Sequence, residues 1–205
     1  AEFYAACSRP ASVYRGNPFV VECAIAYGGD QPAEEPMNVL RFANKVPLLF
    51  QQGACAVTKS LINTNWRSYG LSQSTGALPM GPITIVIHLA SVWVPFTSES
   101  KEAIAHYPEI IKEVKLAIQE CGRKLSSYIY KKRRIGEELK KRGYIEKYIP
   151  HIAEALKELV DAKDYQKDNV ETSLKEILER KRGEIEDIEA ENEEFDETFA
   201  KIGKK

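Results

Sequence analysis

The spacing of large apolar residues changes once along this sequence, near Lys101, and that change constrains the fold more than any other feature. Before it, large apolar residues alternate with small or polar ones, which is the period of a strand with one buried face. After it, they recur every three or four residues, which is the period of an amphipathic helix. We therefore predict an α+β domain, residues 1–107, followed by a helical domain, residues 108–205.

The first domain is predicted to contain a sheet and a covering helix. Residues 19–27 and 83–89 alternate most clearly, and each is predicted to be a strand. Residues 46–50 form a shorter run, in which Pro47 indicates a sheet edge or the start of a strand. Residues 54–62 fit a helix, so the elements predict a sheet with helices on one face.

The second domain is predicted to begin with one long helix. Its apolar repeat starts at Tyr107, and Pro108 is acceptable in the first turn because that position needs no N–H donor. The repeat restarts after a break near Gly143, and repeats at residues 170–177 and 185–199 predict two shorter helices. Short connections favour antiparallel packing of these helices along the long one.

Charge is distributed unevenly along the helical domain, although the whole chain has a net charge of only −1. Residues 112–147 contain twelve basic and five acidic side chains, whereas residues 183–205 contain three basic and nine acidic ones. A basic stretch followed by an acidic one indicates two different partners, or one segment folding back on the other. Solvated helix faces would explain both stretches equally well.

The cysteines and histidines indicate no metal site. Cys7, Cys23, Cys55 and Cys121 are far apart in sequence and include no CxxC pair, which argues against structural zinc and against a disulfide framework. We expect Cys23 and Cys121 to be small core residues. His88 lies inside a predicted strand, where we expect it to be hydrogen-bonded rather than a ligand. No apolar run is long enough to cross a bilayer, so a soluble, cytoplasmic protein is expected.

No motif in the sequence supports an autonomous enzyme, because both common glycine-rich phosphate-binding patterns and any plausible nucleophile–base pair are missing. Four sequence blocks are informative instead: RGNPF at 15–19, NKVPLLFQQGACAVTK at 44–59, NWRSYGL at 65–71 and VPFTSESKEAIA at 94–105. In this order they resemble the transducer domain of the B subunit of archaeal topoisomerase VI. Four long blocks in order are far more specific than one short motif.

This resemblance implies a split βαβ fold like that of ribosomal-protein domains, gyrase and mismatch-repair ATPases. It also implies a non-catalytic transducer, which couples ATP binding to double-strand cleavage and strand passage by the A subunit of the topoisomerase. ATP and Mg²⁺ would bind to an ATPase domain that this sequence lacks, and the catalytic tyrosine would belong to the A subunit. We therefore expect a piece of a longer chain, beginning here at Ala1, that is inactive and binds no cofactor by itself.

The partners implied by the resemblance are the A subunit, duplex DNA, the ATPase domain of the same chain and a second B subunit in an A2B2 complex. No membrane partner is expected, and the protein would be cytoplasmic and associated with the nucleoid. A stand-alone RNA-binding module of the same fold is an alternative, but residues 1–100 contain six basic and six acidic side chains, with no basic excess. A helical scaffold is another alternative, and it leaves the blocks around Trp66 and Lys101 without a role.

Lys101 is the residue to which the resemblance gives the most specific role. In related transducers, a lysine after the last strand reaches into the ATPase domain and contacts the terminal phosphate of ATP. An ammonium group on a flexible stem suits this contact, because it pairs with phosphate as a point charge. We expect Lys101 to open the long helix, where the helix dipole disfavours a cation. An exposed lysine without such a role is the alternative, and Lys59 is the second candidate.

Two basic features are candidates for DNA binding. Trp66, Arg67 and Tyr69 resemble the WKxY element that the family is thought to place against DNA, with Arg67 in place of lysine. Arg67 would contact phosphate, whereas the two aromatic residues would brace the segment or stack on bases. The second feature, here called the basic run, lies toward the far end of the predicted stalk, and a solvated helix end would explain it equally well. It consists of Lys131, Lys132, Arg133 and Arg134, followed by Lys140, Lys141 and Arg142.

Overall fold

The computed structural model describes residues 1–159 and 166–182 of the chain. The described residues form two compact units: the first comprises Ala1–Tyr130, and the second begins at Lys131. The predicted helix at 185–199 and the acidic C-terminal stretch lie outside the described residues.

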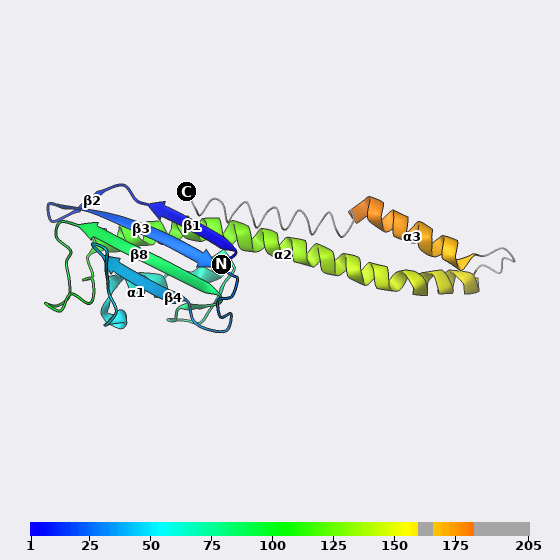
Figure 1. Ribbon diagram of the computed structural model, residues 1–205, viewed down its shortest axis with the longest axis horizontal. Coiled ribbons are helices and arrows are strands. Elements are labelled where there is room, and N and C mark those ends of the chain that lie inside the picture. The colour runs from blue at the N-terminus through cyan, green and yellow to red at the C-terminus, as the bar shows by residue number, and fades with distance from the viewer. Residues whose placement is uncertain (160–165, 183–205) are drawn as a thin grey trace. The chain divides into compact units, whose positions relative to one another are not determined.

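A mixed sheet is the centre of the first unit (Figure 1). Among the described residues, the six strands of this sheet are β1 (Phe3–Ser8), β2 (Ser12–Tyr14), β3 (Asn17–Tyr27), β4 (Asn38–Ala43), β5 (Val46–Pro47) and β8 (Ile83–Ser91). Their order is β1-β3-β8-β4-β5, with β2 also paired to β3. A separate pair consists of β6 (Ser72–Gln73) and β7 (Pro79–Met80).

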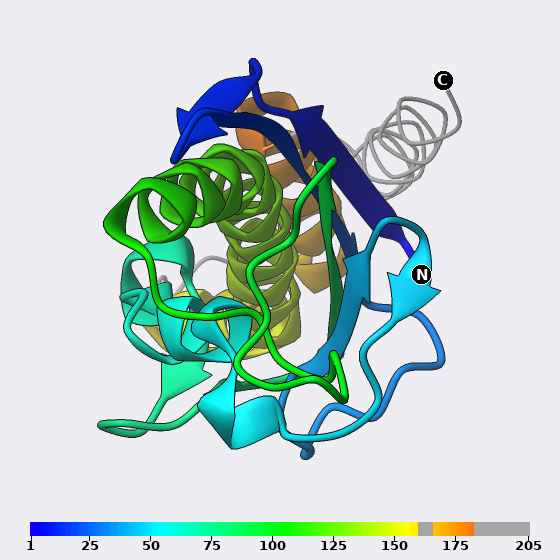
Figure 2. The same ribbon diagram turned by 90° about the vertical axis from the view of Figure 1, so that its left-hand side faces the viewer.

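The alternating runs form the two central strands, as predicted. β3 and β8 are antiparallel, with Cys23 opposite Ile87 and Ile25 opposite Ile85, and these four residues are buried. The core-facing side is covered by α1 (Ala56–Ile62) and by the first part of α2 (Pro108–Leu159), which lie on the same side of the sheet (Figure 2). The α+β class is therefore confirmed.

The βαβ unit differs in detail from the prediction. β4 and β8 are parallel and are joined by a connection that includes η1 (Gln52–Ala54) and α1. Within the described sheet they are direct neighbours, so no strand separates them and the expected split is absent. The predicted strand at 46–50 is shortened to β5, because Leu48 and Phe50 offer their carbonyls to the Arg41 side chain.

The long helix α2 is continuous over 52 residues, so the predicted break near Gly143 is wrong. A glycine in a helix costs only about 1 kcal/mol relative to alanine, which is too little to end a long cooperative helix. The first part of α2 belongs to the sheet unit, because Val114, Ile118 and Leu125 are completely buried. The predicted boundary at residue 107 therefore marks where the helix begins, and the compact unit continues to Tyr130.

The second unit contains the rest of α2 and the helix α3 (Lys167–Arg182), which confirms the predicted helix at 170–177. An ion pair of 2.6 Å between Lys167 Nζ and Glu154 connects the start of α3 to the last turns of α2. Ile149, Ala153 and Leu178 are buried in this unit. Among the described residues, no helix combines the length and apolar content needed to cross a bilayer.

Candidate functional site

Lys101 lies near the tip of a closed loop that follows β8. The loop is held by two backbone hydrogen bonds, from Thr97 N to Ala103 O (2.9 Å) and from Ala105 N to Pro95 O (2.8 Å). Lys101 is exposed, and its φ of 55° is left-handed. The expectation that Lys101 opens the long helix is wrong, because α2 begins only at Pro108 and a residue before proline disfavours the helical conformation. The helix dipole therefore has no bearing on this lysine.

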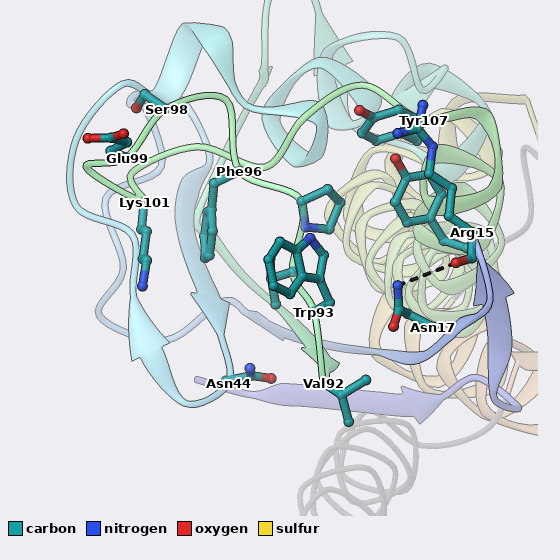
Figure 3. Close-up of a pocket in the computed structure, with 13 residues that line it drawn as sticks. Arg15, Asn17, Asn44, Val92, Trp93, Phe96, Ser98, Glu99, Lys101 and Tyr107 are labelled. Atoms are coloured by element: carbon teal, nitrogen blue, oxygen red, sulfur yellow. Dashed lines mark hydrogen bonds between the residues drawn. The ribbon is translucent and has the colours of Figure 1, made fainter.

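The loop borders a pocket of about 540 Å³ at one end of the sheet unit (Figure 3). Lys101 and Arg15 contribute positive charge to its lining, and Glu99 contributes one carboxylate. Trp93 is also part of the lining, with 69% of its surface exposed. The pocket thus combines an exposed aromatic surface with two cationic side chains from distant parts of the sequence.

Three residues that line this pocket have a positive φ: Arg15 (46°), Asn44 (48°) and Lys101 (55°). Arg15 with Gly16 and Asn44 with Lys45 are the two-residue turns of the β2–β3 and β4–β5 hairpins, which require positive φ values. Lys101 lies outside both hairpins, and its left-handed conformation costs on the order of 1–3 kcal/mol. Among the residues that line the pocket, Lys101 is therefore the one whose backbone indicates local strain.

Arg15 is held in place by two tyrosines. Its guanidinium carbon lies 5.5 Å from the centre of the Tyr14 ring and 5.2 Å from that of Tyr107. The two rings are 4.3 Å apart, centre to centre. Burial, with a further contribution from the hydrogen bond with Tyr107, raises the pKa of Tyr14 to about 12, so this phenol stays neutral. Both contacts are cation–π interactions, which position the cation at the pocket without neutralising it.

The segment resembling the WKxY element forms a short 3-10 helix, η2 (Trp66–Tyr69). Trp66 is 0% exposed, and its indole Nε1 donates a hydrogen bond to the Leu61 carbonyl (2.8 Å). In this conformation Trp66 cannot stack on a base, so its role is to support the segment. Arg67 is exposed, and its Nε donates to the carbonyl of Gln73 (2.8 Å).

Gln73 is a structural residue that the sequence did not reveal. Its Oε1 accepts a hydrogen bond from the Trp66 backbone N–H (3.0 Å), and its Nε2 donates to the carbonyls of Ile62 (3.2 Å) and Ala77 (2.9 Å). It therefore joins α1, η2 and the following turn. A glutamine in a loop rich in serine and glycine carries no sequence signal for this role.

Gly70 ends η2 and fixes it against α2. Its φ is 89°, and an added Cβ would lie 2.9 Å from Ile129 Cγ2. Gly70→Ala is expected to destabilise the protein by about 2–4 kcal/mol, which combines left-handed strain with overpacking. Gly76 is the matched control: its φ is 73°, but nothing lies within 4 Å of an added Cβ.

The two glycine variants should therefore differ in urea denaturation followed by circular dichroism. Gly76→Ala should lose only about 1–2 kcal/mol, because the variant adds strain without a clash. Equal losses for the two variants would mean that η2 does not depend on its contact with α2.

The basic run lies in the middle of α2, which corrects its expected position at a helix end. Lys131, Arg133 and Arg134 are exposed. These residues belong to the second unit, whereas Arg67 and Lys101 belong to the first and line separate pockets. Arg67 borders a hollow of about 230 Å³. Its other lining residues are mostly polar: Ile62, Asn63, Thr64, Asn65, Gln73, Ser74, Thr75 and Gly76.

No group of three or more His, Cys, Asp or Glu side chains that could hold a metal ion occurs within residues 1–159 and 166–182. His88 is hydrogen-bonded through both ring nitrogens, with Nδ1 2.8 Å from Glu22 Oε2 and Nε2 accepting the Lys45 backbone N–H (3.1 Å). The prediction of a hydrogen-bonded strand histidine is therefore confirmed. Cys23 and Cys121 are buried, as expected of core residues.

Comparison with known proteins identifies the family. Residues 1–141 match the family model described as topoisomerase VI B subunit, transducer. The B subunit of type 2 DNA topoisomerase 6 from Natronomonas pharaonis is 46% identical over 179 residues, which are 87% of this chain and 22% of that protein. The corresponding protein from Archaeoglobus fulgidus is 46% identical over 169 residues, 82% of this chain and 28% of that protein.

The chain thus spans 22% and 28% of the length of these two relatives. A crystal structure of the B-subunit of DNA gyrase from Myxococcus xanthus has a TM-score of 0.37 and 20% identity, covering 56% of this chain and 36% of that one. The match to the family model includes all four sequence blocks, the Lys101 loop, η2 and the part of α2 that carries Lys131 to Arg134. The chain therefore belongs to the transducer family of topoisomerase VI B subunits.

Proposed function

We propose that this chain is the transducer of an ATP-dependent B subunit. It would couple ATP binding by an ATPase domain of the same subunit to double-strand cleavage and strand passage by an A subunit, in an A2B2 assembly in the cytoplasm, at the nucleoid. The observation that carries the proposal is the Lys101 pocket, in which two cations border an accessible surface and Lys101 itself has a left-handed conformation that no hairpin turn requires. Such strain is retained where the surrounding structure and the function require it.

In this proposal, Lys101 contacts the terminal phosphate of ATP that is bound by the ATPase domain. Its ammonium group is exposed on a loop that is tied to α1, since Ala56 N donates to Ile104 O (2.9 Å) and His106 Nε2 lies 3.0 Å from Ala54 O. The same loop leads into α2. A phosphate contact at Lys101 would therefore bias the position of α2 relative to the ATPase domain that holds the ATP.

ATP and Mg²⁺ would be held outside this chain. The sequence has no phosphate-binding loop, and the described residues present no carboxylate cluster suited to a magnesium ion. Lys101 would supply one positive charge to the terminal phosphate, and the ATPase domain would supply the remaining contacts. By itself, the chain would hydrolyse no ATP.

Duplex DNA would bind through Arg67 and through Lys131 to Arg134 of the basic run, whereas Arg142 of the same run is buried. Within the described residues, the guanidinium of Arg67 uses Nε for the Gln73 carbonyl, which leaves its two terminal nitrogens for phosphate oxygens. The burial of Trp66 fixes the backbone on which Arg67 is presented. Contacts of this kind position DNA and carry little sequence information.

DNA affinity should fall equally on all sequences when Arg67, or the four residues from Lys131 to Arg134, are replaced by alanine. Each lost phosphate contact should lower the slope of log affinity against log salt by about 0.9. The slope can be measured by fluorescence anisotropy with two duplexes of unrelated sequence. Lys175→Ala is the control, because Lys175 is an exposed lysine of α3 outside both features. An unchanged slope in both variants would refute the DNA contacts while leaving the Lys101 proposal intact.

A further inference from the structure

Three cysteines that are distant in sequence converge in the sheet unit. Cys7 of the edge strand β1 is directly opposite Cys23 of β3. Cys121 of α2 packs beneath them, with its Sγ 3.5 Å from Cys7 Sγ and 3.5 Å from the Cys23 carbonyl oxygen. All three are free thiols, and the proposed function uses none of them. Cys55, which precedes α1, is the remaining cysteine.

Solvent access separates Cys7 from the other two cysteines. Cys23 is 2% exposed and Cys121 is 0% exposed, whereas Cys7 is only partly buried, on the outermost strand of the sheet. A small oxidant can therefore reach Cys7 first. Cys121 lies behind Cys7, with its thiol within hydrogen-bond distance of both the Cys7 sulfur and the Cys23 carbonyl oxygen. This is the arrangement of an accessible thiol with a second thiol ready to react with its oxidised form.

The thiols and the cation around Cys7 favour its ionised form, whereas the Ala117 carbonyl oxygen, 3.4 Å from the Cys7 sulfur, accepts from the protonated thiol. The S–H of Cys121, and then that of Cys23, lower the pKa of the Cys7 thiol to about 3, against the opposing effect of burial. The ammonium of Lys124 acts in the same direction, and its Nζ is held near Cys7 by a 2.9 Å hydrogen bond to the Ala6 carbonyl. The thiolate is the form of cysteine that reacts with oxidants.

We propose that Cys7 and Cys121 form a reversible disulfide when the protein meets hydrogen peroxide. The Cys7 thiolate attacks one peroxide oxygen, the O–O bond breaks, and Cys7 sulfenic acid and hydroxide result. Cys121 then attacks the sulfenic sulfur, and an S–S bond forms as the Cys7 oxygen leaves as water with the Cys121 proton. The two thiols are oxidised by two electrons in total, and the peroxide is reduced to water and hydroxide.

The geometry favours Cys121 over Cys23 as the partner. The two sulfurs of Cys7 and Cys121 are already in contact at 3.5 Å and must approach to about 2.05 Å for the bond to form. The bond would join β1 to α2 and close a loop of more than one hundred residues, which restricts the unfolded chain strongly.

The experiment treats the whole 205-residue chain with a small excess of hydrogen peroxide, then maps peptides without reduction by mass spectrometry. The expected product is a Cys7–Cys121 linked peptide in a monomer, with a melting temperature about 10 °C higher. Dithiothreitol should reverse both changes. Cys55→Ala should respond as the unmodified chain does, whereas Cys121→Ala should form no link and show no rise in melting temperature.

Cys7→Ser provides a second test, because its partly exposed site on an edge strand makes loss of folding unexpected. This variant should also lose the rise in melting temperature. A Cys7–Cys23 link, a link between two chains, or an unreacted Cys7 in the folded protein would each overturn the proposal. None of these outcomes depends on ATP, DNA or the A subunit, so they are separate from a failure of the proposed function.

Discussion

Trp66→Ala is expected to lower the free energy of unfolding by about 3–5 kcal/mol, the usual cost of removing a fully buried tryptophan. The side chain is 0% exposed, and its ring packs edge-on against Tyr69 with the ring centres 5.8 Å apart. The substitution would leave a cavity beneath η2. It would also leave the buried Leu61 carbonyl without its 2.8 Å hydrogen bond from the indole, which adds to the loss.

Urea denaturation at several temperatures measures this cost. Trp93→Ala is the control, because Trp93 is 69% exposed and its loss should change stability by no more than about 0.5 kcal/mol. Trp66→Phe should lie between the two, since it keeps most of the packing and loses the hydrogen bond. A loss below about 1 kcal/mol for Trp66→Ala would show that Trp66 is not a core residue, and base stacking would then become its better role.

The sequence predicted the strands whose alternation is regular and missed those that depend on tertiary context. β3 and β8 were predictable because every second residue is a large apolar one. β1 contains small residues such as Ala5 and Ala6, and β4 places Arg41 on its core-facing side, where a charged residue interrupts the pattern. Arg41 is only partly satisfied there: its Nη2 donates to two carbonyls of the following loop, while its buried Nε and Nη1 have no hydrogen-bond partner among the described residues.

The break predicted in α2 was wrong because a single residue that usually ends a helix was given too much weight. Gly143 indicates an interruption in a short window, yet it lies inside α2, as does Pro150. The pattern of neighbouring residues, and the length of the helix, outweigh a single unfavourable position. The apolar repeat placed the start of α2 correctly at residues 107–108, because Pro108 favours the first helical turn and restricts Tyr107 before it, whereas the expectation that Lys101 opens the helix was wrong.

Of the residues that line the Lys101 pocket, only Lys101 was named as a site candidate from the sequence, and the arrangement of the pocket was not predictable. The blocks identified Lys101, Trp66 and Arg67 by resemblance, whereas the pocket depends on positive φ angles and on contacts that span most of the domain. Arg15 comes to the pocket only because Tyr14 and Tyr107 hold it there. No local pattern in the sequence encodes that contact.

In the complete B subunit assembled with its A subunit, Lys101→Ala is expected to slow ATP turnover and DNA relaxation together, by about tenfold or more. A hydrogen bond to a charged group contributes roughly 1.5–3 kcal/mol, and about 1.4 kcal/mol corresponds to a tenfold change in the closed-state population. The loss should appear in both activities, because the loop that carries Lys101 leads directly into α2. Stability should be nearly unchanged, since Lys101 is exposed and alanine keeps the same left-handed strain.

Three variants decide whether the charge at Lys101 is responsible. Lys101→Arg should recover only part of the activity, because a planar guanidinium is wider than an ammonium group. Lys59→Ala should be nearly normal, because Lys59 is exposed on α1 and does not line the pocket. Turnover and relaxation are compared for all three variants, with thermal melting as the control for folding. Normal relaxation and normal melting in Lys101→Ala would remove Lys101 from the coupling, and a defect in Lys59→Ala would assign the phosphate contact to α1 instead.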